Sequence, residues 1–278
     1  MLRIWQKTEK QKLEPVGMGT AFPFLKEKNH VVSIIGGGGK TTLLYEMAGF
    51  CVKNDQKVLV TTSTHIYRPP KEWHDQSLEA VERKLRTGRA AIIGSACRDP
   101  EKLSMPETEL FEEARKKADL TLIEADGARH LPCKAPAEHE PALLSSSDLV
   151  IGVTGLSALG QPLGKGCFRA ERAAELLDCT MEHHITEAAL ARLIASEQGQ
   201  QKDLKGRTFY AVLHQYEEKE HRAAAEKLVE LLRRQGIEHV LVTCATGNRR
   251  QSGENTNPWY GRAELPVREA EEEWEPGE

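Results

Sequence analysis

The sequence of 278 residues lacks long apolar runs, which argues against a helical membrane protein. Hydrophobic residues make up 39% of the chain, and charged residues interrupt each apolar stretch long before the roughly 20 residues that a bilayer-spanning helix needs. The first residues, from Met1 to Lys7, include basic side chains but neither the apolar segment nor the cleavage site of a secretory signal. We therefore expect a cytoplasmic protein without a membrane partner.

Paired cysteines are also lacking. None of the cysteines forms a C-x-x-C pair or has a spacing suited to zinc: Cys51, Cys97, Cys133, Cys167, Cys179 and Cys244. Scattered cysteines of this kind are typical of small buried residues in a reducing compartment. The distribution excludes a disulfide-stapled scaffold and indicates no metal cluster built on sulfur.

The sequence has no excess of basic residues. Its formal net charge is −4, and the stretch from Glu264 to Glu278 alone contributes −6, so the rest of the chain is close to neutral. A chain without a basic footprint is not expected to bind nucleic acid. The acidic composition predicts a disordered tail over residues 251–278, which leaves residues 1–250 as the folded domain.

What the sequence does contain is a regular alternation of β-rich and helical segments. The β-rich segments cover residues 31–35, 57–64, 90–96, 120–123, 149–153, 209–213 and 240–243. The helical patterns cover residues 40–50, 77–86, 107–117, 170–177, 186–195 and 217–234. This alternation predicts an α/β fold, with a mostly parallel sheet and helices on both of its faces.

The first of these strands runs into a glycine-rich loop. Gly36, Gly37, Gly38 and Gly39 are followed by Lys40, Thr41 and Thr42 at the start of a helix. Glycines at such a position let backbone N–H groups surround a phosphate, and the helix adds its positive end. In this P-loop interpretation Lys40 reaches the β- and γ-phosphates, Thr41 binds Mg²⁺, and Thr42 offers a further hydroxyl.

The loop departs from the usual spacing. The pattern G-x-x-x-x-G-K-[ST] requires a glycine at position 34, where this chain has Ile34. The shorter pattern G-x-x-G-K-T-T fits instead, and a loop of that length occurs in the Mur ligases. We therefore predict a P-loop NTPase-like fold with a shortened loop.

Polar residues follow two other strands at the edge where the carboxyl ends meet, which is where such sheets bind ligands. Glu124 and Asp126 come directly after one strand, and either carboxylate could serve the metal or orient a water molecule. We expect Glu124 at the metal or its waters and Asp126 at the nucleophile or a moving loop. Another strand ends in hydroxyl groups and an imidazole, from Thr61, Thr62, Thr64 and His65, which could contact phosphate, the waters of the metal or a second substrate.

A proline-broken segment from Gly127 to Glu140 follows these acids. Arg129 and Lys134 within it could pair with phosphate or carboxylate groups if the segment closes over a polyanionic substrate. A solvated loop is the alternative. Arg169, at the start of a later helix, is a further candidate, although an ordinary salt link at the helix start explains it equally well.

The sequence gives only a weak indication of which nucleotide base is bound. GTPases carry Asn-Lys-x-Asp after the strand that corresponds to 209–213, whereas this chain has His214-Gln215-Tyr216-Glu217. Guanine recognition is therefore not supported. The expected cofactors are ATP, with GTP as the alternative, and Mg²⁺.

Four segments in order, VVSIIGGGGKTTLLYEMA, KVLVTTSTHIY, LIEADGARHLPCKAPAEHEP and DLVIGVTGLSALGQPLGKGCFRAE, resemble the YqeC family of selenium-dependent hydroxylase accessory proteins. The resemblance implies a P-loop protein that serves the maturation of selenium-dependent molybdenum hydroxylases, with such an enzyme or its cofactor-assembly proteins as partner. Family members often carry Asn-Gln-x-Asp at 214–217, where this chain differs. The spacing Glu124-x-x-Gly127 is also similar to the E-x-x-G of nickel-inserting GTPases, an analogy of fold and role.

Three functions fit these residues. The first is a Mg²⁺-dependent NTPase that drives cofactor assembly, with Lys40, Glu124 and Asp126 as its catalytic residues. The second is a Mur-like ligase or small-molecule kinase whose acidic acceptor is held by Arg129, Lys134 or His65. The third is a nucleotide-gated chaperone without turnover. Selenium handling at Cys133 is a separate hypothesis, which rests on the family context and on the position of that residue.

Overall fold

The computed structural model describes residues 2–8 and 12–245. The tail predicted for residues 251–278 lies outside the described residues. Within the described ranges there is no helix whose length and apolar character would let it cross a membrane.

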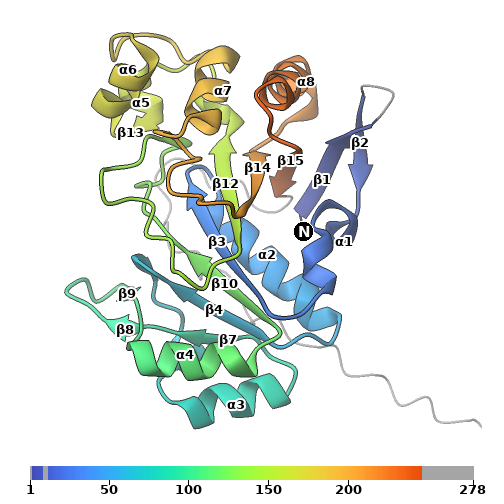
Figure 1. The fold of residues 1–278 in the computed structure, drawn as a ribbon, viewed down its shortest axis with the longest axis vertical. Coiled ribbons are helices and arrows are strands. Elements are labelled where there is room, and N and C mark those ends of the chain that lie inside the picture. The colour runs from blue at the N-terminus through green and yellow to red at the C-terminus, as the bar shows by residue number, and fades with distance from the viewer. Residues whose placement is uncertain (1, 9–11, 246–278) are drawn as a thin grey trace, which may run out of the picture.

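A ten-stranded sheet forms the centre of the molecule (Figure 1). Its strands are, in spatial order, β2 (Leu13–Val16), β1 (Leu2–Lys7), β15 (His239–Ala245), β14 (Thr208–His214), β12 (Leu149–Gly155), β3 (His30–Gly36), β10 (Leu120–Glu124), β4 (Val58–Thr62), β7 (Ala91–Ile93) and β6 (His74–Asp75). All neighbours from β15 to β6 are parallel, whereas β1 is antiparallel to both β15 and β2. The predicted parallel sheet is therefore confirmed, with an antiparallel hairpin added at one edge.

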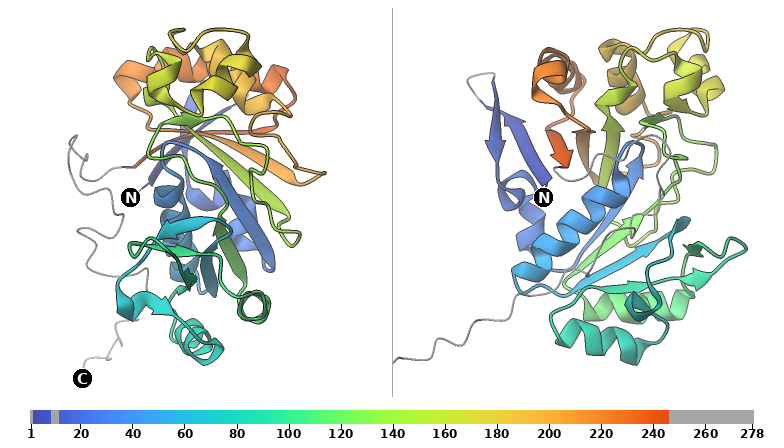
Figure 2. Two further views of the ribbon diagram at one scale, coloured as in Figure 1. Left: turned by 90° about the vertical axis from the view of Figure 1, so that its left-hand side faces the viewer. Right: turned by 180° about the vertical axis from the view of Figure 1, so that it is seen from behind.

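Helices cover both faces of the sheet, as the alternating pattern predicted (Figure 2). On one face, α2 (Lys40–Lys53) and the short α1 (Met18–Ala21) pack against Val32 and Ile34 of β3. On the other, Val31 and Ile35 of the same strand belong to a core with α3 (Leu78–Arg86) and α4 (Thr108–Lys117). That second face is completed by α5 (Leu163–Gly166), α6 (Ala170–Leu177), α7 (Glu187–Ala195) and α8 (Glu218–Arg234).

Several short elements escaped prediction. They include the hairpin β1–β2, a pair of β11 (Cys133–Lys134) with β13 (Cys167–Phe168), and the 3₁₀ turns Pro23–Lys26, Lys71–Trp73 and Leu156–Ala158. A separate three-stranded sheet was also missed, in which β5 (His65–Tyr67) and β9 (Lys102–Ser104) join β8 (Ser95–Ala96), the end of the predicted segment 90–96. Apart from the six-residue β1, these strands have two to four residues, too few for a period-2 pattern to emerge. The partners of β5 and β11 also lie far along the chain, where sequence spacing does not indicate the pairing.

The position of β3 decides where a ligand would bind. The chain passes from β3 to β4, returns through β10 to one flank of β3, and then places β12 on the other flank. In open α/β sheets, ligands bind beyond the carboxyl ends of the strands where the strand order reverses in this way. The end of β3 is also where the glycine-rich loop begins.

Candidate phosphate-binding site

The glycine-rich loop is a tight turn that rests on neighbouring backbone and side chains. Gly36 and Gly39 have φ of +95° and +136°, conformations that L side chains rarely adopt. A Cβ added at Gly36 would lie 2.1 Å from the Val153 carbonyl oxygen, and one at Gly39 would lie 2.1 Å from Cδ2 of His214. Both glycines are therefore required by conformation and by space.

The helix α2 begins immediately after this loop. Gly39 is its N-cap residue, and no side chain caps the backbone N–H groups of the first turn, which contains Lys40, Thr41 and Thr42. An uncapped helix start presents orphan N–H donors and the positive end of the helix dipole. This is an arrangement that binds an anion.

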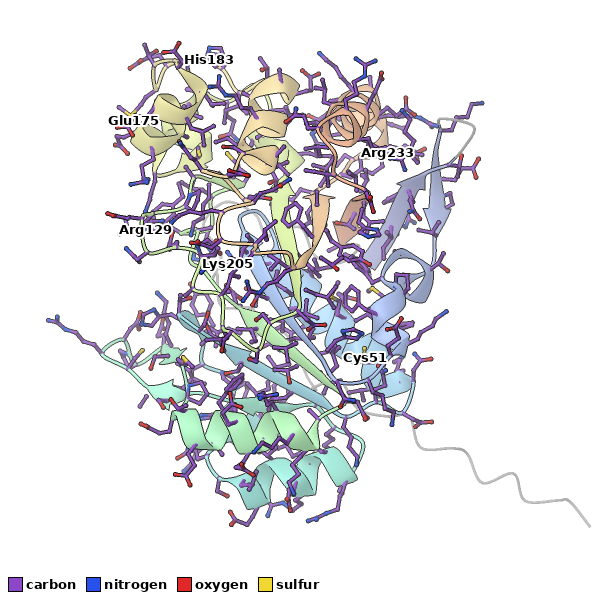
Figure 3. All side chains as sticks on the ribbon, viewed as in Figure 1. Cys51, Arg129, Glu175, His183, Lys205 and Arg233 are labelled. Atoms are coloured by element: carbon purple, nitrogen blue, oxygen red, sulfur yellow. The ribbon has the colours of Figure 1, made fainter. Side chains whose placement is uncertain are left out.

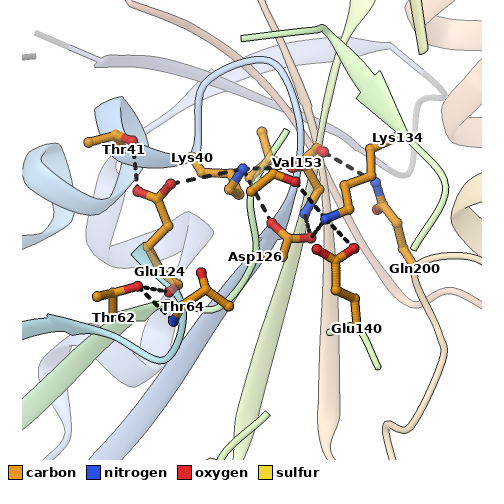
Figure 4. A network of polar contacts seen from close by, with 12 residues as sticks. Lys40, Thr41, Thr62, Thr64, Glu124, Asp126, Lys134, Glu140, Val153 and Gln200 are labelled. Carbon is orange, nitrogen blue, oxygen red and sulfur yellow. Dashed lines mark hydrogen bonds and ion pairs between the residues drawn. The ribbon is translucent and has the colours of Figure 1, made fainter. Parts of the chain in front are cut away.

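The side chain of Lys40 is folded back into the loop, where it is only 6% exposed (Figure 4). Its Nζ atom donates to the Gly36 carbonyl oxygen at 2.7 Å and lies 3.2 Å from Oδ1 of Asp126 and 4.0 Å from Oε1 of Glu124. The structure thus brings together the lysine and both carboxylates that the sequence placed at three separate positions.

Glu124 contacts the first turn of α2. The Thr41 hydroxyl donates to its Oε2 atom at 2.7 Å. Burial raises the pKa of the Glu124 carboxyl, and the Lys40 ammonium and the Thr41 hydroxyl only partly oppose that shift. A buried carboxylate of this kind is stabilised by a cation. Mg²⁺ prefers hard oxygen ligands, and in nucleotide sites most of them are waters and phosphate oxygens. The Thr41 hydroxyl and the Glu124 carboxylate would therefore suffice as its protein ligands.

Larger metal sites are absent from the described ranges, where no group of three or more His, Cys, Asp or Glu side chains could hold a metal ion. Magnesium bound together with a nucleotide needs only one or two protein carboxylates.

The predicted hydroxyl cluster after β4 divides into different environments. The Thr62 hydroxyl donates to the Glu124 carbonyl oxygen at 2.7 Å and accepts from the Thr64 amide at 3.0 Å, so Thr62 braces the segment that carries Glu124. The Thr61 hydroxyl points elsewhere, to the Ile93 carbonyl oxygen. Oγ1 of Thr64 is buried without a hydrogen-bond partner among the described residues. His65 is exposed at the start of β5.

Asp126 joins the loop to the segment that follows β10. Its Oδ2 atom accepts from the Gly36 amide at 2.9 Å and lies 3.1 Å from Nζ of Lys134. With Lys40 on the other oxygen, the Asp126 carboxylate lies between two lysines. The Asp126 carboxylate therefore contacts both the loop backbone and the Lys40 ammonium.

The proline-broken segment is not a solvated loop. Lys134 is 2% exposed, and its ammonium contacts Asp126 and, at 2.8 Å, Oε2 of Glu140. Arg169 forms a bidentate pair with Glu140 at 2.6 and 3.2 Å. Although burial opposes it, hydrogen bonds from Lys134 and the Ala137 amide lower the pKa of Glu140. Two of the cations proposed for a substrate are thus paired with carboxylates of this chain.

Arg129 differs from these two cations, because its side chain is exposed. Its guanidinium lies over the Phe168 ring at 5.3 Å, and Figure 3 shows it at the outer edge of the molecule. Of the three cations considered for an acceptor within residues 127–169, Arg129 alone is both exposed and without an ion pair in the described part of the chain.

Two buried residues beneath the loop were missed. The Gln200 amide donates to Oγ1 of Thr154 at 2.8 Å and lies under Gly36, and nothing in its sequence context indicated this. His214 packs against Gly39 and hydrogen-bonds through Nδ1 to the Thr243 hydroxyl at 2.7 Å. The sequence marked His214 only as a departure from a base-reading motif. The structure gives it a supporting position under the loop.

The burial of His214 should make the free energy of unfolding depend on pH. Burial lowers the pKa of His214 from 6.5 to about 4, so its full contribution to stability is present above pH 6.5 and is lost as the pH falls toward 4. We expect wild-type protein to lose roughly 3 kcal/mol of unfolding free energy across this range through His214, a loss absent in His214→Asn. Denaturant unfolding between pH 7 and 4 measures it. The exposed His183→Asn is the control and should behave as wild type.

Cys133 lies beside another cysteine. It is opposite Cys167 in the β11–β13 pair, and both thiols are buried. The neighbouring Cys167 thiol and burial raise the pKa of Cys133 well above its ordinary value, and the Cys133 thiol donates to the Gly166 carbonyl oxygen at 3.3 Å. A neutral buried thiol is a weak nucleophile. A role for Cys133 with selenium stays a hypothesis.

Together the fold and the site define a class: an α/β protein whose parallel sheet presents a glycine-rich loop, a lysine and two carboxylates at one edge. The family model described as YqeC protein matches residues 32–171, and the chain belongs to the YqeC family. The Uncharacterized protein YqeC of Escherichia coli (strain K12) is 29% identical over 219 residues, which cover 76% of this chain and 85% of that protein. No solved structure matches the chain.

Proposed function

We propose that this protein binds a nucleoside triphosphate with Mg²⁺ and hydrolyses it. One observation carries the proposal: the 2.7 Å contact between the Thr41 hydroxyl and Glu124, formed next to the Lys40 ammonium at the uncapped start of α2. A phosphate chain placed there would meet backbone N–H donors, a lysine and a metal-binding pair at one point.

Each residue has a part in this reaction. The backbone of Gly36–Gly39 would surround the phosphates, and Lys40 would leave the Gly36 carbonyl to neutralise charge on the γ-phosphoryl group. Thr41 and Glu124 would hold Mg²⁺, which supplies electrostatic stabilisation of the transferred group when bound. Thr42 and Thr64 offer further hydroxyl groups. Asp126 is the candidate that orients the attacking water.

The base and the cellular role are inferred from the sequence. ATP is favoured over GTP, because the guanine-reading motif is absent and His214 is buried under the loop. In the cell, hydrolysis would drive a step in the maturation of selenium-dependent molybdenum hydroxylases, with such an enzyme or its cofactor-assembly proteins as partner. This part of the proposal depends on the four motifs that resemble the family.

The exposed Arg129 supports a second candidate, transfer of the γ-phosphoryl group to a small acidic acceptor, as in a kinase or ligase. The two reactions differ in their need for a second substrate. A hydrolase releases inorganic phosphate from nucleotide and water alone, whereas a transferase without its acceptor releases almost none.

The test is a binding and phosphate-release assay with ATP and GTP, with and without Mg²⁺. We expect saturable ATP binding and Mg²⁺-dependent release of phosphate. Binding with Mg²⁺ but without release would favour the transferase or a nucleotide-gated chaperone. Absence of binding to either nucleotide would overturn the proposal.

A further inference from the structure

The carboxylate of Asp126 belongs to a chain of alternating charges, here called the ion-pair chain. It runs from Lys40 through Asp126, Lys134 and Glu140 to Arg169, with closest distances of 3.2, 3.1, 2.8 and 2.6 Å along the way. Figure 4 shows the contacts from Lys40 to Glu140. The side chains before Arg169 are at least nine-tenths buried. Three cations and two anions are thus coupled behind the glycine-rich loop.

Resting on the proposed function, we propose that Lys134 is a positioning residue that competes with Lys40 for Asp126 and so sets how easily Lys40 is released to a nucleotide phosphate. The Lys134 ammonium is held by protein groups, because it contacts Asp126 and Glu140 and donates to the Gly127 carbonyl oxygen at 2.6 Å. With its side chain only 2% exposed, it acts on the nucleotide through Asp126 rather than by direct contact.

The competition follows from the cost of a bare buried charge. If Lys40 turned to a phosphate and Lys134 were absent, Asp126 would keep, among the residues that the structure describes, only the Gly36 amide as a partner. Leaving a buried carboxylate without a cation is strongly unfavourable. With Lys134 in place, Asp126 stays paired while Lys40 moves.

Glu140 works in the opposite direction. It draws the Lys134 ammonium away from Asp126, and Arg169 holds Glu140 in position. If Glu140 were neutral, the Lys134 ammonium would pair more strongly with Asp126, and Lys40 would then be released from Asp126 more easily. Two residues that do not touch the nucleotide should thus shift its affinity in opposite directions.

The experiment measures the dissociation constant of ATP by calorimetry on the full chain. Lys134→Met should weaken binding roughly tenfold, whereas Glu140→Gln, which keeps its hydrogen-bond acceptor, should tighten it severalfold. In an Asp126→Asn background, Lys134→Met should have no effect, because the carboxylate for which the two lysines compete is gone. Thermal unfolding of each variant checks that it is folded.

The outcomes separate this inference from the function on which it rests. Equal weakening by Lys134→Met and Glu140→Gln, or a cost of Lys134→Met that persists beside Asp126→Asn, would indicate a merely structural role and overturn the inference. If Lys134→Met fails to fold, ATP binding by Glu140→Gln and by Asp126→Asn tests the inference instead, because both variants should bind ATP more tightly than wild type. A wild-type protein that binds neither ATP nor GTP would overturn the proposed function, and this inference with it.

Discussion

Replacing Lys40 with alanine is expected to weaken ATP binding by roughly 100-fold and to abolish turnover. A charge-assisted hydrogen bond to phosphate contributes about 1.5–3 kcal/mol, and Lys40 would make more than one such contact. The structure places its ammonium within the loop, 2.7 Å from the Gly36 carbonyl oxygen, so a short movement brings it to an anion at the start of α2. Calorimetric titration with ATP measures the loss.

Stability should change little in this variant, because Asp126 keeps Lys134 as its cation when Lys40 is removed. The matched control is Lys53→Ala, which removes an exposed lysine from the last turn of the same helix. It should bind ATP as wild type does. ATP binding by Lys40→Ala at wild-type strength would contradict the phosphate-binding interpretation of the loop.

The parallel part of the fold could be predicted from the sequence because local patterns determine it. Strands such as Leu120–Glu124 are short apolar runs, and helices such as Glu218–Arg234 repeat apolar residues on one face. The rule that ligands bind at the carboxyl edge then brings Lys40 and Glu124 to one place without any knowledge of tertiary contacts. The structure has them 4.0 Å apart.

The rest of the site depends on contacts that no local pattern encodes. The sequence predicts Lys134 as a substrate ligand because it is a cation in a polar segment, and Arg169 because it is a cation at the start of a later helix. Their pairing with Glu140 arises only when β11 and β13 lie side by side. Gln200 and His214 reach the loop from distant parts of the chain. Sequence reasoning identified the residue types of the site but not which charges neutralise one another.

Replacing Glu124 with glutamine separates metal-dependent catalysis from nucleotide binding. Glutamine keeps an acceptor for the Thr41 hydroxyl but removes the carboxylate that would hold Mg²⁺. A metal stabilises the transition state by several kcal/mol, so phosphate release should fall by roughly 100-fold or more. ATP binding without Mg²⁺ should be nearly unchanged. Phosphate release as fast as that of wild type, with the same Mg²⁺ dependence, would exclude Glu124 as a metal ligand.

The same variant should be at least as stable as wild type at neutral pH. Because burial raises the pKa of Glu124 above 4.5, its charged form is disfavoured in the folded protein. The stabilising effect of the neutral carboxyl is fully present below pH 4.5 and is lost as the pH rises through the raised pKa. The stability advantage of Glu124→Gln should therefore grow with pH in metal-free buffer. Denaturant unfolding at several pH values measures this difference, and the exposed Glu109→Gln should show no such trend. A stability advantage of Glu124→Gln that does not depend on pH would mean that Glu124 is not destabilised by carrying a buried charge.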